Sequence, residues 1–262
     1  MPELPEVETI VRTLAPRLLG RHIHFSEFLA PLVLRYNREP IAERLAGQAI
    51  RSIERRGKFI VFILDRGVMV IHLGMTGKLL FDSGRTPYTR AIFSCDGLTL
   101  FYDDIRQFGS IEWCPDMPDR ITRLGAEPFD ITPDELFRAT RNRRTSIKAL
   151  LLNQTAVRGL GNIYVDEALW RAGIHPRRIA AKLTYNRAGA LHKAMLDVLT
   201  EAIDCGGSSI SNYVDATGRS GSFQERHKVY GREGQPCQRC GLAIRRITVA
   251  QRGTHYCPKC QR

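Results

Sequence analysis

The first half of the chain carries short apolar runs separated by turn residues, a pattern typical of a β-rich domain. The run 58–64 is dominated by β-branched and aromatic residues and ends at Asp65-Arg66-Gly67. Asp96-Gly97 predicts a hairpin, because both residues tolerate the positive φ of a tight two-residue turn. Four strands are expected, at residues 58–64, 68–73, 91–95 and 98–102.

Helical spacing of apolar residues occurs at the start of the chain and again from about residue 130 onward. Pro5 to Leu14 predicts a leading helix, since proline suits a first turn and Glu6 complements the dipole. Thr132-Pro133-Asp134-Glu135 is a capping box that begins a second helix. Three more helices are expected: one capped by Thr145 and running through Leu152, one capped by Asn162 and ending near Gly173, and one stopping at Gly206-Gly207.

These elements predict an α+β protein with three parts in chain order. Residues 1–129 are expected to form a β-rich domain behind a leading helix, and residues 130–224 a helical domain. Residues 225–262 are expected to form a short cysteine-rich module. The chain has no internal repeat and no low-complexity tract.

The charge of the chain is strongly positive. Lys and Arg number 39 against 27 Asp and Glu, which gives a formal net charge of +12. Such an excess favours a polyanionic partner, and charge alone leaves DNA, RNA and an anionic membrane surface open. No apolar run is long enough to span a bilayer, and the acidic N-terminus does not resemble a secretory leader. We therefore expect a protein of the reducing cytoplasm.

Four of the seven cysteines form two matched pairs near the C-terminus. Sixteen residues separate the pairs, enough for a β-hairpin that brings four thiolates around one tetrahedral ion. Four thiolates leave no open position, so the sequence predicts one structural zinc per chain. The predicted ligands are Cys237, Cys240, Cys257 and Cys260. The remaining three, Cys95, Cys114 and Cys205, are interpreted as small core residues.

Motifs in a fixed order along the whole chain resemble those of bacterial formamidopyrimidine-DNA glycosylases, which act on 8-oxoguanine and formamidopyrimidines and also nick abasic sites. The resemblance implies an N-terminal β-sandwich, a helix–two-turn–helix domain and a zinc finger. It also implies double-stranded DNA as the partner of a monomeric enzyme. The motifs are Met1 to Thr9, Arg56-Gly57-Lys58, His72 to Gly77, Arg106 to Gly109, Gly159 to Tyr164, Tyr230 to Arg232 and Gln251 to Thr254. The segment Ser208 to Gln224 resembles the lesion-recognition loop of the same family.

The resemblance assigns catalysis to four residues. Once Met1 is removed, Pro2 is a secondary amine, and an α-amino group titrates near ~7.7–8.0, so part of it is a neutral nucleophile. Glu3 is implied as the proton donor to the sugar ring and Lys58 as a proton carrier in β-elimination. Arg252 matches the residue linked to δ-elimination, and its guanidinium suits a phosphate. Glu6 is interpreted as an organiser of the helix start.

DNA contacts are also implied by matching positions. Flipping a base out of the duplex leaves a gap, and Met75, Arg106 and Phe108 match the residues that fill it; we call them the void-filling trio. Asn162 heads a helix whose N-terminus suits a phosphate. Arg144, Lys148 and Tyr88 complete the expected contacts, although Tyr88 stands where the family commonly has histidine.

Three other functions remain open at this stage. An endonuclease VIII-like enzyme for oxidised pyrimidines usually opens Pro-Glu-Gly-Pro, whereas this chain has Pro2-Glu3-Leu4-Pro5. A non-catalytic zinc-ribbon DNA-binding protein does not need Pro2, Glu3 and Lys58 together. An RNA-binding zinc ribbon explains the charge and the cysteines but leaves the N-terminus unexplained.

Overall fold

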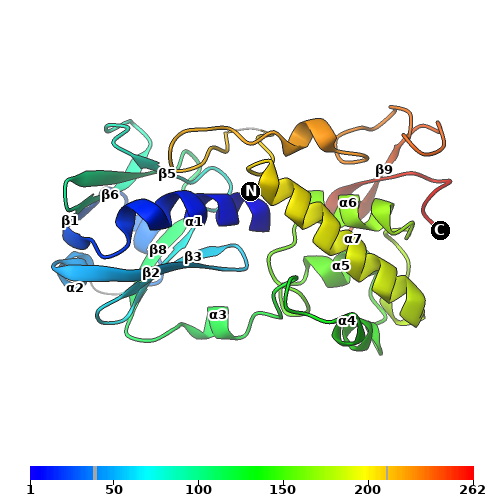
Figure 1. Ribbon diagram of the computed structural model, residues 1–262, viewed down its shortest axis with the longest axis horizontal. Helices are drawn as coiled ribbons and strands as arrows, with labels where there is room; N and C mark the ends of the chain where they lie inside the picture. Colours follow the sequence, from blue (N-terminus) through cyan, green and yellow to red (C-terminus); the bar gives the residue numbers. More distant parts are fainter. Residues whose placement is uncertain (38–39, 211) are drawn as a thin grey trace. The chain divides into compact units, whose positions relative to one another are not determined.

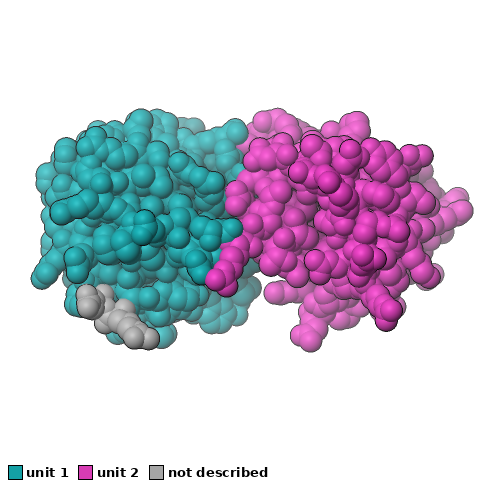
Figure 2. Space-filling model, turned by 90° about the horizontal axis from the view of Figure 1, so that it is seen from below, with its two compact units in different colours: residues 1–122, 205–222 teal, residues 123–204, 223–262 magenta. Residues whose placement is uncertain are grey.

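The computed structural model describes residues 1–37, 40–210 and 212–262. The chain forms two compact units, coloured separately in Figure 2. Unit 1 contains residues 1–122 and 205–222, and unit 2 contains residues 123–204 and 223–262. The segment 205–222, which the sequence analysis placed with the helices, packs with unit 1; position 211 of the expected recognition loop lies outside the described residues. Within the described ranges, no helix combines the length and apolarity that a bilayer crossing requires.

Unit 1 is built on an eight-stranded antiparallel sheet with the order β5-β7-β6-β1-β2-β3-β4-β8 (Figure 1). The four expected strands are confirmed as β3, β4, β6 and β7, and the predicted turn joins β6 to β7 with Cys95 opposite Leu98. The strands are β1 His22–Phe28, β2 Gln48–Arg56, β3 Phe59–Leu64, β4 Val68–His72, β5 Lys78–Phe81, β6 Thr89–Cys95, β7 Leu98–Asp103 and β8 Ser110–Cys114.

The sheet consists of two four-stranded halves. They are joined through a short β1–β2 pairing in which His22 lies opposite Ala49 and Ile23 opposite Gln48. Both halves contribute to one apolar core, together with the buried face of helix α1, Leu4–Leu18. The expected β-sandwich with a leading helix is therefore confirmed. Short helices in the connections are η1 Pro31–Leu34, α2 Ala42–Leu45 and α3 Asp119–Thr122.

Unit 2 contains four longer helices and a two-stranded hairpin (Figure 1). The capping box at Thr132 is confirmed, because its hydroxyl accepts the Glu135 N–H at 3.2 Å. The elements are α4 Pro133–Thr140, α5 Ile147–Leu152, α6 Asn162–Arg171, η2 Ala180–Lys182, α7 Tyr185–Asp204, η3 Phe223–Arg226, β9 Arg245–Val249 and β10 Arg252–Tyr256.

Two of the predicted helix caps are wrong by one residue. Helix α5 is capped by Ser146 rather than Thr145, since the Ser146 hydroxyl accepts the Ala149 N–H at 3.2 Å. Helix α6 is capped by Gly161, and Asn162 is already its first helical residue. The Asn162 side chain does not cap the helix; its amide donates to the Gly253 carbonyl.

Candidate functional site

The N-terminus of the chain is folded into unit 1 and ordered by the first turn of α1. Pro2, Glu3 and Glu6 are all buried, and Glu3 occupies the N-cap position. One carboxylate oxygen of Glu6 accepts the Glu3 N–H at 2.8 Å, which closes a capping box. The expected role of Glu6 as an organiser agrees with this contact.

The other carboxylate oxygen of Glu6 anchors the returning segment 205–222. It accepts the Ser208 N–H at 2.7 Å, and the Tyr213 hydroxyl donates to the Glu6 carbonyl at 3.2 Å. Gly207 has φ +83°, and a Cβ there would lie 2.8 Å from the Glu6 carboxylate. Only glycine therefore allows this close approach. Glu6 thus ties the start of the chain to a segment about 200 residues later.

Lys58 lies in the turn between β2 and β3 and is only 8% exposed. Its ammonium and the Arg106 guanidinium lie close enough to act electrostatically on the N-terminal amine. Burial is the main cause that lowers the pKa of this amine below its usual 8.0; Glu3 and Glu6 oppose the shift, and the two cations reinforce it. The structure therefore places Glu3 and Lys58 near the amine of Met1, the residue that precedes Pro2.

The void-filling trio forms one exposed cluster on unit 1. The Arg106 guanidinium lies 4.6 Å from the centre of the Phe108 ring, and its Nη1 lies 3.1 Å from the Met75 sulfur. Met75 is 41% and Phe108 50% exposed, far more than core packing would leave them. Arg106 therefore contacts both of the other members of the trio.

Asp104 holds the two loops of the trio together, and the sequence analysis did not single it out. It is 1% exposed, accepts the Gly109 N–H at 2.8 Å and is bonded by the Thr76 hydroxyl. Arg35 clamps the same loop, donating to the carbonyls of Gln107 at 2.6 Å and Gly109 at 2.8 Å. An aspartate directly after a strand was the available signal, but it is too common a feature to be specific.

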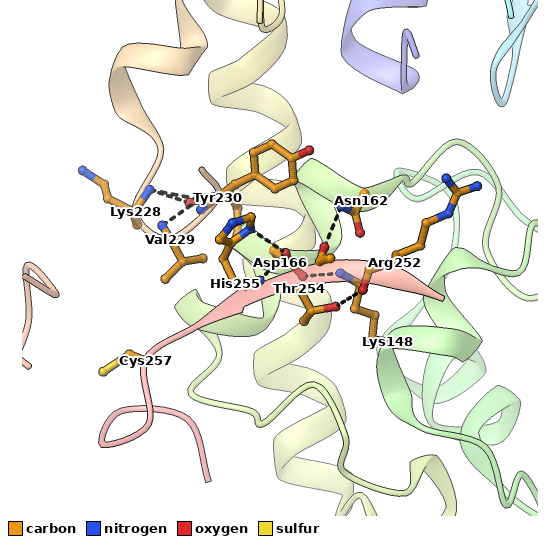
Figure 3. A network of polar contacts seen from close by, with 12 residues as sticks. Lys148, Asn162, Asp166, Lys228, Val229, Tyr230, Arg252, Thr254, His255 and Cys257 are labelled. Carbon is orange, nitrogen blue, oxygen red and sulfur yellow. Dashed lines mark hydrogen bonds and ion pairs between the residues drawn. The ribbon is translucent and has the colours of Figure 1, made fainter. Parts of the chain in front are cut away.

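In unit 2, Arg252 is the first residue of β10 and its side chain is exposed. Asn162 Nδ2 donates to the Gly253 carbonyl at 2.9 Å, so part of its amide binds the hairpin (Figure 3).

Glu167 is fully buried and accepts the backbone N–H groups of Lys228, Val229 and Tyr230. Burial raises the pKa of Glu167, and the three donors oppose that shift.

Lys148 does not fit the role of a DNA contact. Its side chain is fully buried, and its ammonium lies 2.7 Å from Asp166 Oδ1, whose side chain is also fully buried (Figure 3). A buried ammonium cannot reach a phosphate without leaving this pair uncompensated. We correct the prediction and assign Lys148 to the internal framework of unit 2. Arg144 and Tyr88, by contrast, are exposed, in unit 2 and unit 1 respectively.

The four predicted zinc ligands lie together, with their sulfur atoms all within 4.8 Å of one another. Cys237 Sγ is 3.9 Å from Cys260 Sγ, and Cys240 Sγ is 3.4 Å from Cys257 Sγ. A tetrahedral zinc with bonds of about 2.3 Å needs sulfur separations of about 3.8 Å, so the cluster fits this ion.

The cysteines differ in how easily they ionise, because burial and the neighbouring thiols raise the pKa values of Cys257 and Cys260, whereas the pKa of Cys237 is lowered. Burial opposes ionisation of Cys237, but the Arg239 backbone N–H and the Trp170 side chain outweigh it and lower the pKa to about 6. Trp170 of α6 packs with Val229, Ile244 and the cysteines in a small apolar cluster. The residues present therefore fit one structural zinc, in agreement with the prediction.

Comparisons with known proteins agree over the whole chain. Residues 1–111 match the formamidopyrimidine-DNA glycosylase N-terminal domain, residues 124–214 the H2TH domain of the same glycosylase, and residues 234–262 a zinc finger found in FPG and IleRS. A formamidopyrimidine-DNA glycosylase of Solibacter usitatus is 52% identical, with all of both chains covered. The MutM (FPG) protein of Thermus thermophilus is 42% identical, with 99% of this chain and 98% of that chain covered and a TM-score of 0.90. Lactococcus lactis Fpg, solved with abasic-site DNA, is 38% identical, with 99% of each chain covered and a TM-score of 0.91.

Proposed function

The chain belongs to the formamidopyrimidine-DNA glycosylase family, and from that premise we propose how its own residues divide the reaction. It is a DNA glycosylase of base excision repair. Solved relatives hold DNA containing Fapy-dG, 8-oxo-G or an abasic site, and we infer the same substrates for this chain. The full-length similarity supports this function over an enzyme for oxidised pyrimidines or a non-catalytic zinc ribbon.

Pro2 is proposed as the nucleophile. With Met1 removed, its nitrogen is a secondary amine that can bond to the sugar C1′. The glycosidic bond breaks as the new bond forms, and the base leaves with the electron pair and takes up a proton. The amine gives up its proton, and protonation of the ring oxygen breaks the C1′–O4′ bond. The iminium ion that results withdraws electrons and acidifies the neighbouring C2′ proton. The observation that carries this proposal is that Glu3 and Lys58, both buried, lie near the Met1 amine, which adjoins Pro2.

Glu3 and Lys58 are proposed as the proton carriers. Glu3 adjoins the nucleophile and is 3% exposed, so its carboxyl group can protonate the sugar ring oxygen without competition from bulk water. Lys58 is proposed to take the C2′ proton during β-elimination, which breaks the bond to the 3′ phosphate. Both roles follow from the family resemblance and agree with the position of these residues in unit 1.

DNA contacts are proposed on both units. The void-filling trio and Tyr88 are exposed on unit 1, and Arg144 and Arg252 are exposed on unit 2. Arg252 is proposed to bind the phosphate next to the lesion and to assist δ-elimination, and Asn162 is proposed to contact a phosphate from the start of α6. Zinc, when bound, cross-links the two ends of the hairpin module and takes no part in the chemistry. We further propose that the chain acts as a monomer.

Borohydride trapping tests the mechanism. Reduction of the iminium during reaction with an 8-oxoguanine:cytosine duplex should fix a covalent protein–DNA adduct. Peptide mapping should place that adduct on Pro2. An active enzyme that yields no trapped species would overturn the proposal. Lys193→Met, an exposed change on α7, serves as the control and should trap normally.

The state of Met1 gives an independent test of the nucleophile. A retained methionine turns the Pro2 nitrogen into a tertiary amide, which cannot attack C1′. Active protein should therefore begin at Pro2 in an intact-mass measurement. A fully active, homogeneous species that still carries Met1 would exclude Pro2 and leave Lys58 as the remaining amine of the buried group.

A further inference from the structure

The hairpin that carries Arg252 has no neighbouring strand among the described residues. Its strands pair with Arg252 opposite Val249 and Gly253 opposite Thr248. Because hydrogen-bonded and non-bonded pairs alternate, the backbone groups of Gly253 and His255 point away from β9. These outward groups need partners from outside the hairpin.

Helix α6 supplies those partners from one of its faces. Asn162 donates to the Gly253 carbonyl at 2.9 Å, and Asp166 Oδ2 accepts the His255 N–H at 2.9 Å. Asn162 and Asp166 are four residues apart, so both side chains point toward β10, as Figure 3 shows. The pair therefore takes the place of a strand along the outer edge of β10.

Asp166 is itself fixed from the other side. Its Oδ1 accepts a hydrogen bond from the fully buried Lys148 ammonium of α5 at 2.7 Å. A buried ion pair of this kind adds little net stability but defines one geometry, because either charge alone would be strongly unfavourable. The carboxylate is thus held between α5 and β10.

The turn before Arg252 needs stabilising contacts of this kind. Ala250 and Gln251 have φ values of 50° and 58°, in the left-handed region that disfavours residues other than glycine. A slip of β10 by one residue would direct the Arg252 side chain to the opposite face of the hairpin. The register of β10 therefore decides where the guanidinium points.

We propose that Asp166, with Asn162, is a positioning residue that holds β10 in register and so directs Arg252 at its phosphate. The inference rests on the role proposed above for Arg252. It assigns a function to Lys148 as well. The Lys148 ammonium holds the Asp166 carboxylate in place, and the carboxylate holds β10 through the His255 N–H.

Two double variants separate the hydrogen bond to β10 from the buried charge. Lys148→Met with Asp166→Asn removes both charges and keeps an acceptor oxygen for the His255 N–H. Lys148→Met with Asp166→Leu also removes both charges but has no acceptor. Zinc-loaded full-length proteins are compared on an abasic-site duplex for borohydride trapping rate, the ratio of δ- to β-elimination product, and zinc per chain.

The Asp166→Asn double variant should keep the parent product ratio. The Asp166→Leu double variant should lose about tenfold in δ-elimination product, because a small displacement of a positioned group has effects of this size or larger. Its trapping rate and zinc content should not change. The matched control is Lys193→Met with Asp197→Asn, an exposed pair on α7 with the same 2.7 Å separation, which should match the parent.

Equal ratios of δ- to β-elimination product in the two Asp166 double variants would overturn the proposal. Loss of zinc in the Asp166→Leu double variant would also overturn it, because Asp166 would then have a merely structural role. Arg252→Gln is measured in parallel. If it leaves the ratio unchanged, the role proposed for Arg252 fails. If it lowers the ratio while the two Asp166 variants agree, only the positioning inference fails.

Discussion

Glu6 in unit 1 and Asp166 in unit 2 perform the same task in different ways. Each is a buried carboxylate on a helix, and each divides its two oxygens between two partners. Glu6 binds two backbone N–H groups, whereas Asp166 binds one backbone N–H and one buried ammonium. The negative charge of Glu6 is therefore stabilised by backbone N–H groups, one of them at the helix start. The negative charge of Asp166 is stabilised by the Lys148 ammonium on another helix.

The difference shows how two regions with proposed chemical roles, the N-terminal site and the Arg252 hairpin, are organised. The N-terminal site is organised largely by neighbours in sequence, through the capping box of Glu3 and Glu6. The Arg252 hairpin is organised by side chains about 90 to 100 residues away, namely Lys148, Asn162 and Asp166. The first arrangement combines this local capping box with a distant contact to Ser208, and the second requires unit 2 to be intact. The following predictions test that contrast.

The largest expected effect comes from Glu3→Gln. A positioned proton donor contributes about 10²–10⁴-fold in rate, so single-turnover excision of 8-oxoguanine should fall by that amount. DNA affinity, measured by fluorescence anisotropy, should hardly change. Arg252→Gln should instead retain excision and lose δ-elimination. If both variants lost excision equally, the division of chemistry between the units would be wrong.

Glu6→Ala should give the next largest effect. It leaves the buried N–H groups of Glu3 and Ser208 without their acceptor, at about 1–3 kcal/mol each in the free energy of unfolding. Urea denaturation measures the loss. Arg12→Ala on the same helix removes an exposed ion pair to Glu8 and should lose no more than about 1 kcal/mol. A loss as small as the control's would show that Glu6 is not an anchor.

Cys237→Ser tests the dependence of the hairpin on its metal. Loss of one of four thiolates should weaken zinc binding and reduce DNA affinity by about 10–100-fold, while unit 1 remains folded. Metal analysis, anisotropy and circular dichroism check the three parts. Cys114→Ser, in unit 1, should leave both zinc and DNA binding unchanged. Unaltered DNA affinity in zinc-free protein would contradict the expectation.

The pH dependence of trapping should give the smallest change. Burial is the main cause that lowers the pKa of the Met1 amine below 8.0. Removal of Met1 is proposed to leave the Pro2 amine in the same surroundings, so its neutral, nucleophilic form should persist to lower pH. The trapping rate on abasic DNA should rise with pH through a midpoint below 8.0 and then level off. Lys58→Met removes a cation that favours the neutral amine, so the midpoint should move upward. A midpoint at or above 8.0 in the parent protein would contradict the assigned environment.

Features encoded by neighbouring residues could be predicted from the sequence. The Asp96-Gly97 hairpin, the Thr132 capping box and the paired cysteines each carry their structural reason within a few residues, and the structure confirms all three. Strands β1, β2, β5 and β8 were not predicted, because their burial patterns alternate weakly. Their pairing is decided by partners distant in the chain.

The site residues divide in the same way. Pro2, Glu3 and Lys58 could be proposed as catalytic residues because distinct motifs surround them. Lys148 was misassigned because a basic residue of the helical domain was interpreted as a DNA contact. Its buried location depends on Asp166, 18 residues later on another helix. No periodicity in the sequence indicates that two such charges will meet in the interior.

The covered edges of the hairpin have a consequence for the behaviour of the protein in a crowded solution. A two-stranded sheet offers two open edges, and open edges recruit strands from other chains into aggregates. Here Asn162 and Asp166 cover the edge of β10, and the Arg177 guanidinium donates to the Thr248 carbonyl on the opposite edge at 3.2 Å. The side chains that hold the hairpin in register therefore also protect it against self-association.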